Sequence, residues 1–324
     1  MNIPIFSVHI YKVQKNKKIA IFVKKQFTKV HKKSIILTMK LEQGDTIGII
    51  ALSGACDKDK VEKSKSYFES LGYKVKLSKN IYDQVRYLAG DDDTKVDELH
   101  DFFKDPEIKL IMCARGGYGG IRLINKIKYN LIKKYSKPFC GFSDVTSLLL
   151  MITRHAGIVT YHSPMACYDF EGNVNEQTKQ NFFRAIEGEP LTLYGKKVYK
   201  NGFAQGLLLG GNLSTVVSLC GQNFLPDENF IFFAEDLNEP VYKIDKMFQQ
   251  LLNIKKFVKN CKGIVLGDFL NVDNEEWLEE YFEELSKKVQ IPTIGGFLIS
   301  HEGEKVTLPI GKYAQLNEKT LLIP

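Results

Sequence analysis

The sequence predicts an α/β fold with two domains. Residues 46–152 alternate short apolar segments with helix-like segments, which indicates a parallel sheet covered by helices on both faces. Two of the apolar segments run directly into glycine turns, at Gly116-Gly117 and at Gly141. From about residue 190 the pattern changes to short strand-like pieces around two longer helices. We therefore expect a doubly wound, Rossmann- or flavodoxin-like domain, followed by a smaller α/β domain with a mixed, barrel-like sheet.

The first domain is expected at residues 44–170. Strands are predicted at 46–52, 73–77, 110–114 and 139–140, and helices at 57–71, 94–103, 121–127 and 147–152. The acidic run Asp91-Asp92-Asp93 favours the helix that follows it, because carboxylates complement the positive end of the helix dipole. Ligand sites in such sheets lie at the carboxyl ends of the strands, so we expect the site in the turns after residues 114 and 140.

The second domain is expected at residues 191–324. The connection at 171–190 is predicted to form one helix with polar residues on all of its faces. Strands are predicted at 191–193, 207–209, 231–234 and 263–266, and helices at 241–252 and 274–288. The pairs Gly210-Gly211 and Gly295-Gly296 are expected to mark turns.

The positive net charge of +7 over 324 residues comes from the lysines of the N-terminal segment. Residues 1–38 contain nine lysines and no acidic residue, and removing these nine charges from +7 leaves −2 for residues 39–324. We expect residues 1–43 to be a basic extension, with Met39 as the natural start; a basic arm on a membrane surface is the alternative. An intact mass that includes residues 1–38 would overturn this expectation. Nucleic-acid binding would rest on this segment alone, so we expect none.

The cysteines indicate a reducing compartment. All six are scattered, without a C-x-x-C pair, and most lie in apolar segments. We expect a cytoplasmic protein, although the basic segment leaves export open. No apolar run approaches the roughly 18–20 residues that span a bilayer, so no membrane association is expected.

Ser143 lies at the expected junction between strand and helix, in Gly141-Phe142-Ser143-Asp144-Val145. A serine on such a sharp turn exposes its hydroxyl and frees nearby amides, which suits a nucleophile. The segment departs from the G-x-S-x-G elbow because Val145 replaces the last glycine. The pattern alone therefore fits two roles: a nucleophile, or a helix cap formed by Ser143 or Asp144.

The glycine turn Arg115-Gly116-Gly117-Tyr118-Gly119-Gly120 precedes a predicted helix. Unpaired backbone N–H groups at a helix start suit an oxyanion or a phosphate. The turn matches neither G-x-G-x-x-G nor G-x-x-x-x-G-K-[ST], which disfavours a nucleotide-dependent enzyme. A tight turn with positive φ is the purely structural alternative.

A serine nucleophile needs a base and an acid that orients the base. Among the six histidines, His162 and His301 are expected on loops, and Glu235-Asp236 ends a buried strand. The chain contains no H-E-x-x-H, no S-x-x-K and no zinc-ligand spacing. A Ser…Glu…His order, with no metal and no cofactor, is the arrangement that remains.

In their joint order these motifs resemble those of the LD-carboxypeptidases (muramoyltetrapeptide carboxypeptidases), a family of serine peptidases that also includes the microcin-immunity peptidases. The resemblance extends from about Gly44 to Pro324. It is carried by Tyr87-Leu88-Ala89-Gly90, Asp105-Pro106-Glu107, Ala114-Arg115-Gly116-Gly117-Tyr118-Gly119, Gly141-Phe142-Ser143-Asp144-Val145-Thr146, Gly210-Gly211-Asn212-Leu213, Glu235-Asp236, Tyr242-Lys243-Ile244-Asp245 and His301 with Thr307-Leu308-Pro309-Ile310-Gly311. Ser300 stands where glycine commonly precedes the histidine, and Lys243 and Lys246 stand where arginines are common.

The resemblance implies a catalytic triad of Ser143, Glu235 and His301. It also implies an oxyanion hole formed by the backbone N–H groups of Asp144 and Gly117. Three further residues are expected to bind substrate: Arg115, Tyr118 and Asn212. For Arg115, a clamp on a free carboxylate and a structural salt bridge that holds the glycine turn are equally open.

The implied substrate is a tetrapeptide derived from peptidoglycan, from which the terminal D-alanine is released, and the implied assembly is a homodimer. Three alternatives stay open. A microcin-immunity peptidase would cut peptide–nucleotide antibiotics, but its glycine turn tends to carry asparagines. A binding module would retain muropeptides without turnover, and a nucleotide-dependent enzyme would bind nucleotide tightly.

Overall fold

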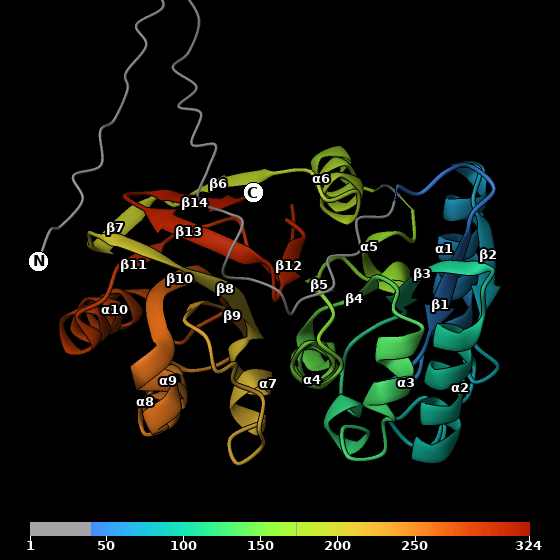
Figure 1. Ribbon diagram of the computed structural model, residues 1–324, viewed down its shortest axis with the longest axis horizontal. Coiled ribbons are helices and arrows are strands. Elements are labelled where there is room, and N and C mark those ends of the chain that lie inside the picture. Colours follow the sequence, from blue (N-terminus) through green and yellow to red (C-terminus); the bar gives the residue numbers. More distant parts are fainter. Residues whose placement is uncertain (1–39, 173) are drawn as a thin grey trace, which may run out of the picture. The chain divides into compact units, whose positions relative to one another are not determined.

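The computed structural model describes residues 40–172 and 174–324, which belong to one compact unit (Figure 1). The expectations for the basic extension and for Met39 lie outside these residues. Within them, no helix has both the length and the apolar character needed to cross a bilayer.

The first sheet has the strand order β12-β5-β4-β3-β1-β2 (Figure 1). Its strands are β1 (Thr46–Ile50), β2 (Lys74–Leu77), β3 (Ile108–Cys113), β4 (Phe139–Gly141), β5 (Thr160–His162) and β12 (Leu308–Ile310). Strands β1 to β5 are parallel, and β12 is antiparallel at the edge. The order 2-1-3-4-5 is that of flavodoxin-like folds, which confirms the predicted doubly wound sheet. It places the topological switch point between β1 and β3.

The second sheet has the order β6-β14-β13-β8-β9-β10-β11-β7. Its strands are β6 (Leu191–Tyr194), β7 (Lys197–Lys200), β8 (Phe203–Asn212), β9 (Phe230–Leu237), β10 (Cys261–Leu270), β11 (Thr293–Gly295), β13 (Tyr313–Asn317) and β14 (Thr320–Ile323). Strands β8 to β11 are parallel and the others pair antiparallel, so the sheet is mixed as expected. Its order runs from one open edge to the other and forms no closed barrel. With eight strands it is also not the smaller of the two sheets.

Most helices appear where the apolar periodicity predicts them. The α-helices are α1 (Lys58–Ser70), α2 (Asp92–Lys104), α3 (Tyr129–Lys134), α4 (Thr146–Ala156), α5 (Ala166–Asp169), α6 (Glu176–Ile186), α7 (Leu213–Ser218), α8 (Val241–Leu252), α9 (Lys255–Asn260) and α10 (Glu275–Val289). Two 3₁₀ turns, η1 (Gly120–Arg122) and η2 (Ser143–Val145), follow the glycine turn and β4.

Two helix predictions are wrong in detail. The helix predicted at 121–127 is only the turn η1 and further turns, from which Leu123, Ile124 and Ile127 reach the core without helical backbone. The helix α6 is not polar all round, because Phe182 is fully buried and its ring packs 5.4 Å from that of Phe170.

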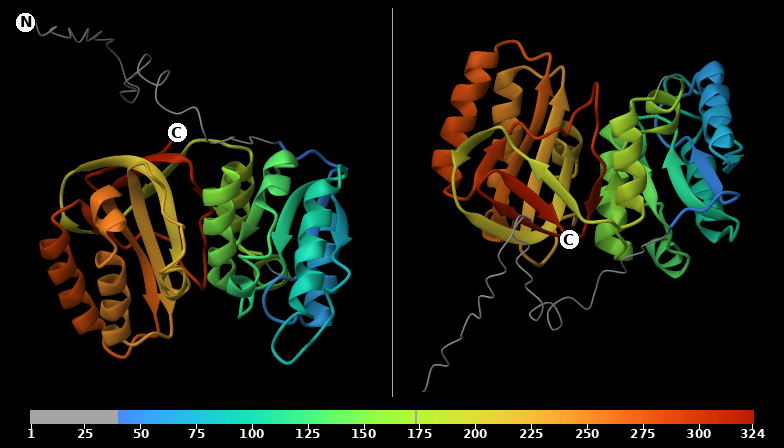
Figure 2. Two further views of the ribbon diagram at one scale, coloured as in Figure 1. Left: turned by 60° about the horizontal axis from the view of Figure 1, so that its bottom comes forward. Right: turned by 90° about the horizontal axis from the view of Figure 1, so that it is seen from above.

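The two sheets share a hydrophobic core. Helix α4 contacts β4 and β5 of the first sheet and β8 of the second (Figure 1). On the second sheet, Phe248 of α8 packs against Phe232 of β9 and against Phe282 of α10; Figure 2 shows these two helices, in orange, on one face of that sheet. Because β12 comes from the C-terminal segment but joins the first sheet, the chain crosses between the sheets three times, after β5, after β11 and after β12. The domain limits given above remain a prediction.

Candidate active site

Ser143 opens the turn η2 directly after β4, at the carboxyl edge of the first sheet. Its φ of 59° lies in the left-handed region, which is uncommon for a residue other than glycine and recurs at functional turns. Neither Ser143 nor Asp144 caps α4: the helix begins after Val145, without a side-chain cap. The helix-cap alternative is therefore wrong, and the Ser143 hydroxyl forms no hydrogen bond with the residues that the structure describes.

The Asp144 carboxylate ties the Ser143 turn to two other strand ends. Its Oδ2 accepts hydrogen bonds from Ser53 Oγ at 2.6 Å and from the backbone N–H of Gly120 at 2.7 Å. Burial raises the pKa of Asp144, and the hydrogen bonds from Ser53 and Gly120 oppose this rise. Since Ser53 follows β1 and Gly120 ends the glycine turn after β3, one side chain holds the three loops together at the switch point.

The glycine turn passes close to the serine. A Cβ at Gly116 would lie 2.9 Å from Ser143 Cβ and 3.1 Å from Ser143 Oγ, so a larger residue would displace the hydroxyl. The backbone of Gly116 is fixed by Gly54, whose N–H donates to its carbonyl at 3.1 Å. In the described part of the chain, the N–H groups of Gly117 and Asp144 have no acceptor. Both are therefore open to an oxyanion, and their role remains a prediction.

Glu235 and His301 meet at the carboxyl end of the second sheet. Glu235 lies in β9 with no exposed surface, and its Oε2 is hydrogen-bonded to Nδ1 of His301. Burial raises the pKa of Glu235, while the bond to His301 opposes the rise. A carboxylate that accepts from Nδ1–H leaves Nε2 without a proton, which is the tautomer that a general base requires.

Phe142 links the two halves of the site. It immediately precedes Ser143, and its ring centroid lies 4.8 Å from that of His301 in an edge-to-face arrangement. Across the same boundary, the backbone N–H of Asn212, at the end of β8, donates to Thr146 Oγ1 at 3.3 Å, at the start of α4. The structure thus pairs the predicted acid with the predicted histidine and packs the histidine against Phe142, the residue next to Ser143. The catalytic roles of the three residues remain a prediction.

The predicted substrate residues differ in their surroundings. Asn212 caps α7: its side chain accepts from Thr215 N–H at 3.1 Å and donates to Asp236 at 2.9 Å, which is a structural role. Arg115 is exposed, pairs with no carboxylate in the described ranges, and donates from Nη1 to the carbonyl of Ala55 at 3.0 Å. The salt-bridge alternative for Arg115 is therefore wrong. Substrate binding by all three residues remains a prediction.

Tyr118 lies exposed beside the glycine turn. Its ring packs edge-to-face against Tyr87 at 5.7 Å, and both rings are about half exposed. Tyr87 belongs to one of the segments that carry the family resemblance, but the resemblance implied no function for this residue. An exposed aromatic pair next to Arg115 offers a surface for an apolar part of a ligand.

Sequence reasoning missed two buried groups beside the triad. His162 was expected on a loop, but it ends β5 with 3% of its surface exposed, between the rings of Phe142 and Phe233. Burial lowers its pKa to about 3, helped by the neighbouring His301 and Lys305. Lys305 is also buried and is paired with Asp169. Their packing partners are distant in sequence, so no local signal marks them.

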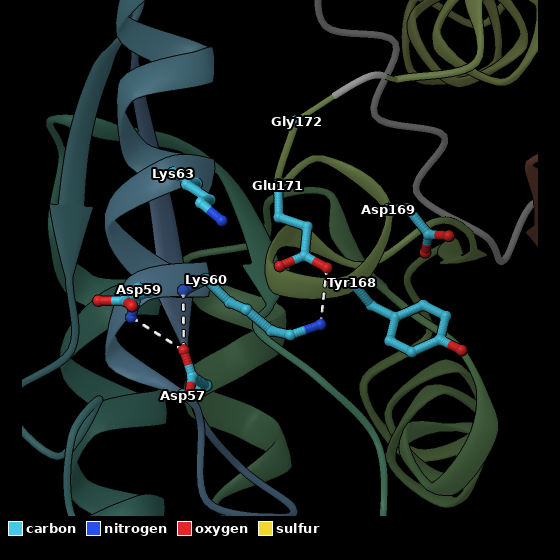
Figure 3. Close-up of a pocket in the computed structure, with 8 residues that line it drawn as sticks. All are labelled: Asp57, Asp59, Lys60, Lys63, Tyr168, Asp169, Glu171 and Gly172. Atoms are coloured by element: carbon cyan, nitrogen blue, oxygen red, sulfur yellow. Dashed lines mark hydrogen bonds and ion pairs between the residues drawn. The ribbon is translucent and has the colours of Figure 1, made fainter.

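A pocket of about 530 Å³ lies outside the triad (Figure 3). It is lined by α1 and α5 residues and includes the ion pair between Lys60 and Glu171, at 2.6 Å. Neither Ser143, Glu235 nor His301 lines this pocket. Asp169 does line it, and the same carboxylate pairs with the buried Lys305. Within the described residues, no group of three or more His, Cys, Asp or Glu side chains is arranged to hold a metal ion.

Comparisons with known proteins match both halves of the chain. The model of the LD-carboxypeptidase N-terminal domain matches residues 47–163, and that of the LD-carboxypeptidase C-terminal domain matches residues 205–316. A protein of Bacillus subtilis, named probable murein peptide carboxypeptidase, is 36% identical over 297 residues, which cover 87% of this chain and 92% of that protein.

Solved structures agree in fold. The muramoyltetrapeptide carboxypeptidase of Oxalobacter formigenes superposes with a TM-score of 0.80 at 26% identity, over 86% of this chain and 98% of the other. An MccF-like protein of Bacillus anthracis superposes with a TM-score of 0.81 at 25% identity, over 90% and 99% of the two chains. The similarity therefore spans both sheets and the residues between them.

Proposed function

The chain belongs to the LD-carboxypeptidase family, and from this premise we propose that it releases the terminal D-alanine from tetrapeptides derived from peptidoglycan, with Ser143 as nucleophile, His301 as base and Glu235 as orienting acid. The observation that carries the proposal is the hydrogen bond between His301 and Glu235. The ring of this histidine also packs against Phe142, the residue that precedes Ser143. The 36% identity to a probable murein peptide carboxypeptidase, over nearly the whole of both chains, supports the substrate class.

In the first half of the reaction, Ser143 Oγ attacks the carbonyl carbon before the terminal D-alanine, and its proton passes to His301 Nε2. The buried Glu235 carboxylate holds the imidazole in the required tautomer and stabilises the imidazolium. Backbone N–H groups of Gly117 and Asp144 stabilise the oxyanion, each worth roughly 3–4 kcal/mol. The C–N bond then breaks, His301 returns the proton to the leaving amine, and an ester to Ser143 remains.

In the second half, water attacks the carbonyl carbon of this ester and gives a proton to His301. The ester C–O bond breaks, and the proton passes from His301 to Ser143 Oγ. The tripeptide leaves with a new carboxylate, and the enzyme returns to its starting state. Every step uses residues of this chain and water.

Arg115 would bind the free carboxylate of the terminal D-alanine. It is one of five arginines in the chain, it is exposed beside the glycine turn, and only one of its N–H groups donates to a described carbonyl. Arg115→Ala should raise KM about ten-fold or more with kcat nearly unchanged, because a uniform binding contact is lost. Arg184→Ala, which removes an exposed arginine paired with Glu189, is the matched control. An unchanged KM for Arg115→Ala would exclude the clamp.

A peptidase for peptide–nucleotide conjugates is the second candidate, because the MccF-like structure superposes as closely as the carboxypeptidase. The arginine in the glycine turn favours the wall peptide. The deciding experiment offers three substrates side by side: the tetrapeptide ending in D-alanine, the same peptide ending in L-alanine, and an aminoacyl sulfamoyl adenosine. We expect hydrolysis of the first alone. Hydrolysis of the nucleotide conjugate alone would support the second candidate, and binding without hydrolysis would support a non-catalytic module.

A further inference from the structure

The base of the triad is carried by a segment without regular structure. Residues 296–307 join β11 of the second sheet to β12 of the first, and no helix or strand includes them. His301 lies in the middle of this segment, so its distance from Ser143 depends on how the segment is anchored. A displacement of about 1 Å at a catalytic group can cost roughly 100-fold in rate.

Lys305 is the anchor of this segment on the first sheet's side. Its ammonium group pairs with the Asp169 carboxylate of α5, and only 4% of the residue is exposed. The ammonium also lies 4.4 Å from the ring centroid of Phe142 and 4.9 Å from that of Tyr168. The backbone N–H of Lys305 donates to Thr178 Oγ1 at 2.9 Å. A buried ammonium held by a carboxylate and two aromatic rings has one defined position.

The Phe142 ring is shared by the base and by this lysine. His301 packs against it at 4.8 Å and the Lys305 ammonium at 4.4 Å, and the next residue in the chain is Ser143. Asp169 is itself fixed, because its Oδ2 accepts from the backbone N–H of Met165 at 2.8 Å. The Met165 side chain, in turn, reaches the glycine turn, where a Cβ on Gly116 would lie 3.5 Å from it. The anchor point is therefore part of the wall around the nucleophile.

The Asp169 carboxylate forms its ion pair with Lys305. Figure 3 shows Asp169 apart from Lys60 and Glu171, which pair with each other. The near-complete burial of Lys305 also leaves no surface for a substrate contact, so its effect must pass through its neighbours.

We propose that the buried Lys305–Asp169 pair is a positioning device that holds the 296–307 segment against the Phe142–Ser143 turn and thereby sets His301 within reach of the Ser143 hydroxyl. The inference rests on the proposed function in that it takes these two residues as base and nucleophile. Lys305 is a positioning residue, and substrate affinity does not depend on it.

The test compares Lys305→Met with the double variant Lys305→Met/Asp169→Asn. The single variant leaves the buried Asp169 carboxylate without its cation, whereas the double variant removes both charges and preserves side-chain volume. Lys137→Met is the control for the loss of a buried ammonium elsewhere, since Lys137 is 7% exposed and donates to backbone carbonyls at the far end of the first sheet. The readouts are kcat, KM and the rate at which a fluorophosphonate labels Ser143.

Positioning predicts that both Lys305 variants lose about 10- to 100-fold in kcat with KM nearly unchanged, and that labelling slows in parallel. Lys137→Met should keep the wild-type kcat. If the single variant does not fold, the double variant decides alone. A wild-type kcat and labelling rate in the double variant would overturn the inference. Any loss in Lys305→Met would then come from the uncompensated Asp169 charge and not from the missing ion pair.

Failure of the proposed function is distinguishable from failure of the inference. A wild-type protein that is labelled at Ser143 but releases no D-alanine would contradict the substrate and leave the labelling comparison intact. A wild-type protein that is not labelled at all would overturn the inference.

Discussion

At Ser143 the chain adopts a backbone conformation that its side chain disfavours, and the neighbours explain why it persists. The Asp144 carboxylate is bonded to Ser53 and Gly120, and Gly116 leaves room for the hydroxyl. Holding a non-glycine residue at positive φ costs of order 1–3 kcal/mol, which the surrounding contacts offset. The result is a hydroxyl that projects from the turn without a hydrogen-bond partner among the described residues.

The buried His162 predicts a pH dependence of stability. Its pKa is lowered to about 3 by burial and by His301 and Lys305, whereas an unfolded histidine titrates near 6.5. Between these values the unfolded state binds more protons than the folded state, so stability rises with pH and falls as pH drops below about 6.5. In His162→Gln this contribution is absent, and the free energy of unfolding should depend less steeply on pH.

The difference between the two proteins should approach about 1.4 kcal/mol per pH unit between about pH 6 and pH 4. Burial also lowers the pKa of His100 and His155, but both are present in each protein and cancel in the comparison. Urea denaturation at pH 4.5, 5.5, 6.5 and 7.5 measures the effect. Parallel curves for the two proteins would contradict it.

Much of the residue-scale site could be predicted from the sequence, because its motifs occur in a fixed order along the chain. Glu235 and His301 are bonded as the triad requires. The contacts of Phe142, His162 and Lys305 could not be predicted, since each joins residues from different elements that no local pattern relates. Asn212 shows a second limit, because no sequence pattern indicated that its side chain caps α7. Its contact with substrate remains a prediction.

At the scale of elements, the site is built where strands end. Strands β1, β3 and β4 of the first sheet lead into loops that Asp144 ties together, and the carboxyl ends of β8 and β9 in the second sheet carry Asn212 and Glu235. Parallel strands deliver all their carboxyl ends to one edge, so each sheet presents several loops at the same place. The contact between Asn212 and Thr146 joins the two edges.

Gly210 lies where β8 comes very close to the backbone of its neighbouring strand β9. It was expected in a turn, but it lies inside β8 with φ of 150°, and a Cβ there would lie 1.9 Å from the Phe233 carbonyl oxygen. Gly210→Ala must therefore push β9, which carries Glu235, and should lower the free energy of unfolding by about 3 kcal/mol or more. Gln205→Ala, at an exposed position of the same strand, should change it by less than about 0.5 kcal/mol. Urea unfolding compares them, and an equal effect would refute the packing argument.

Element predictions succeeded where periodicity and burial coincide, as in α1, α8 and β9. They failed at 121–127, where three buried apolar side chains imitate helical spacing although turns carry them. They also failed at Gly210-Gly211, because glycine in a strand that another backbone approaches closely looks like glycine in a turn. Both errors come from tertiary contacts that local composition does not encode.

At the scale of the whole molecule, the two sheets belong to one compact unit. The C-terminal segment returns to the first sheet as β12, and one apolar cluster includes side chains from both sheets. The expected domain division at residues 171–190 remains a prediction. The homodimer implied by the family resemblance remains a prediction.

A shared core predicts that the two sheets unfold together. Cys113 of β3 and Cys261 of β10 are both buried in the common cluster and report on different sheets. Pulsed thiol labelling at increasing urea, mapped to each peptide, should give coincident midpoints. Exposure of one thiol well before the other would show that the sheets are independent domains.

The most direct test of the account is mass spectrometry of a disaccharide-tetrapeptide incubated with the wild-type protein and, in parallel, with Ser143→Ala. The account predicts loss of one D-alanine with the wild type and none above background with the variant, since the variant lacks the oxygen that attacks the peptide carbonyl. Loss of D-alanine with both proteins would contradict the assignment of Ser143 as nucleophile. Loss with neither would contradict the proposed substrate.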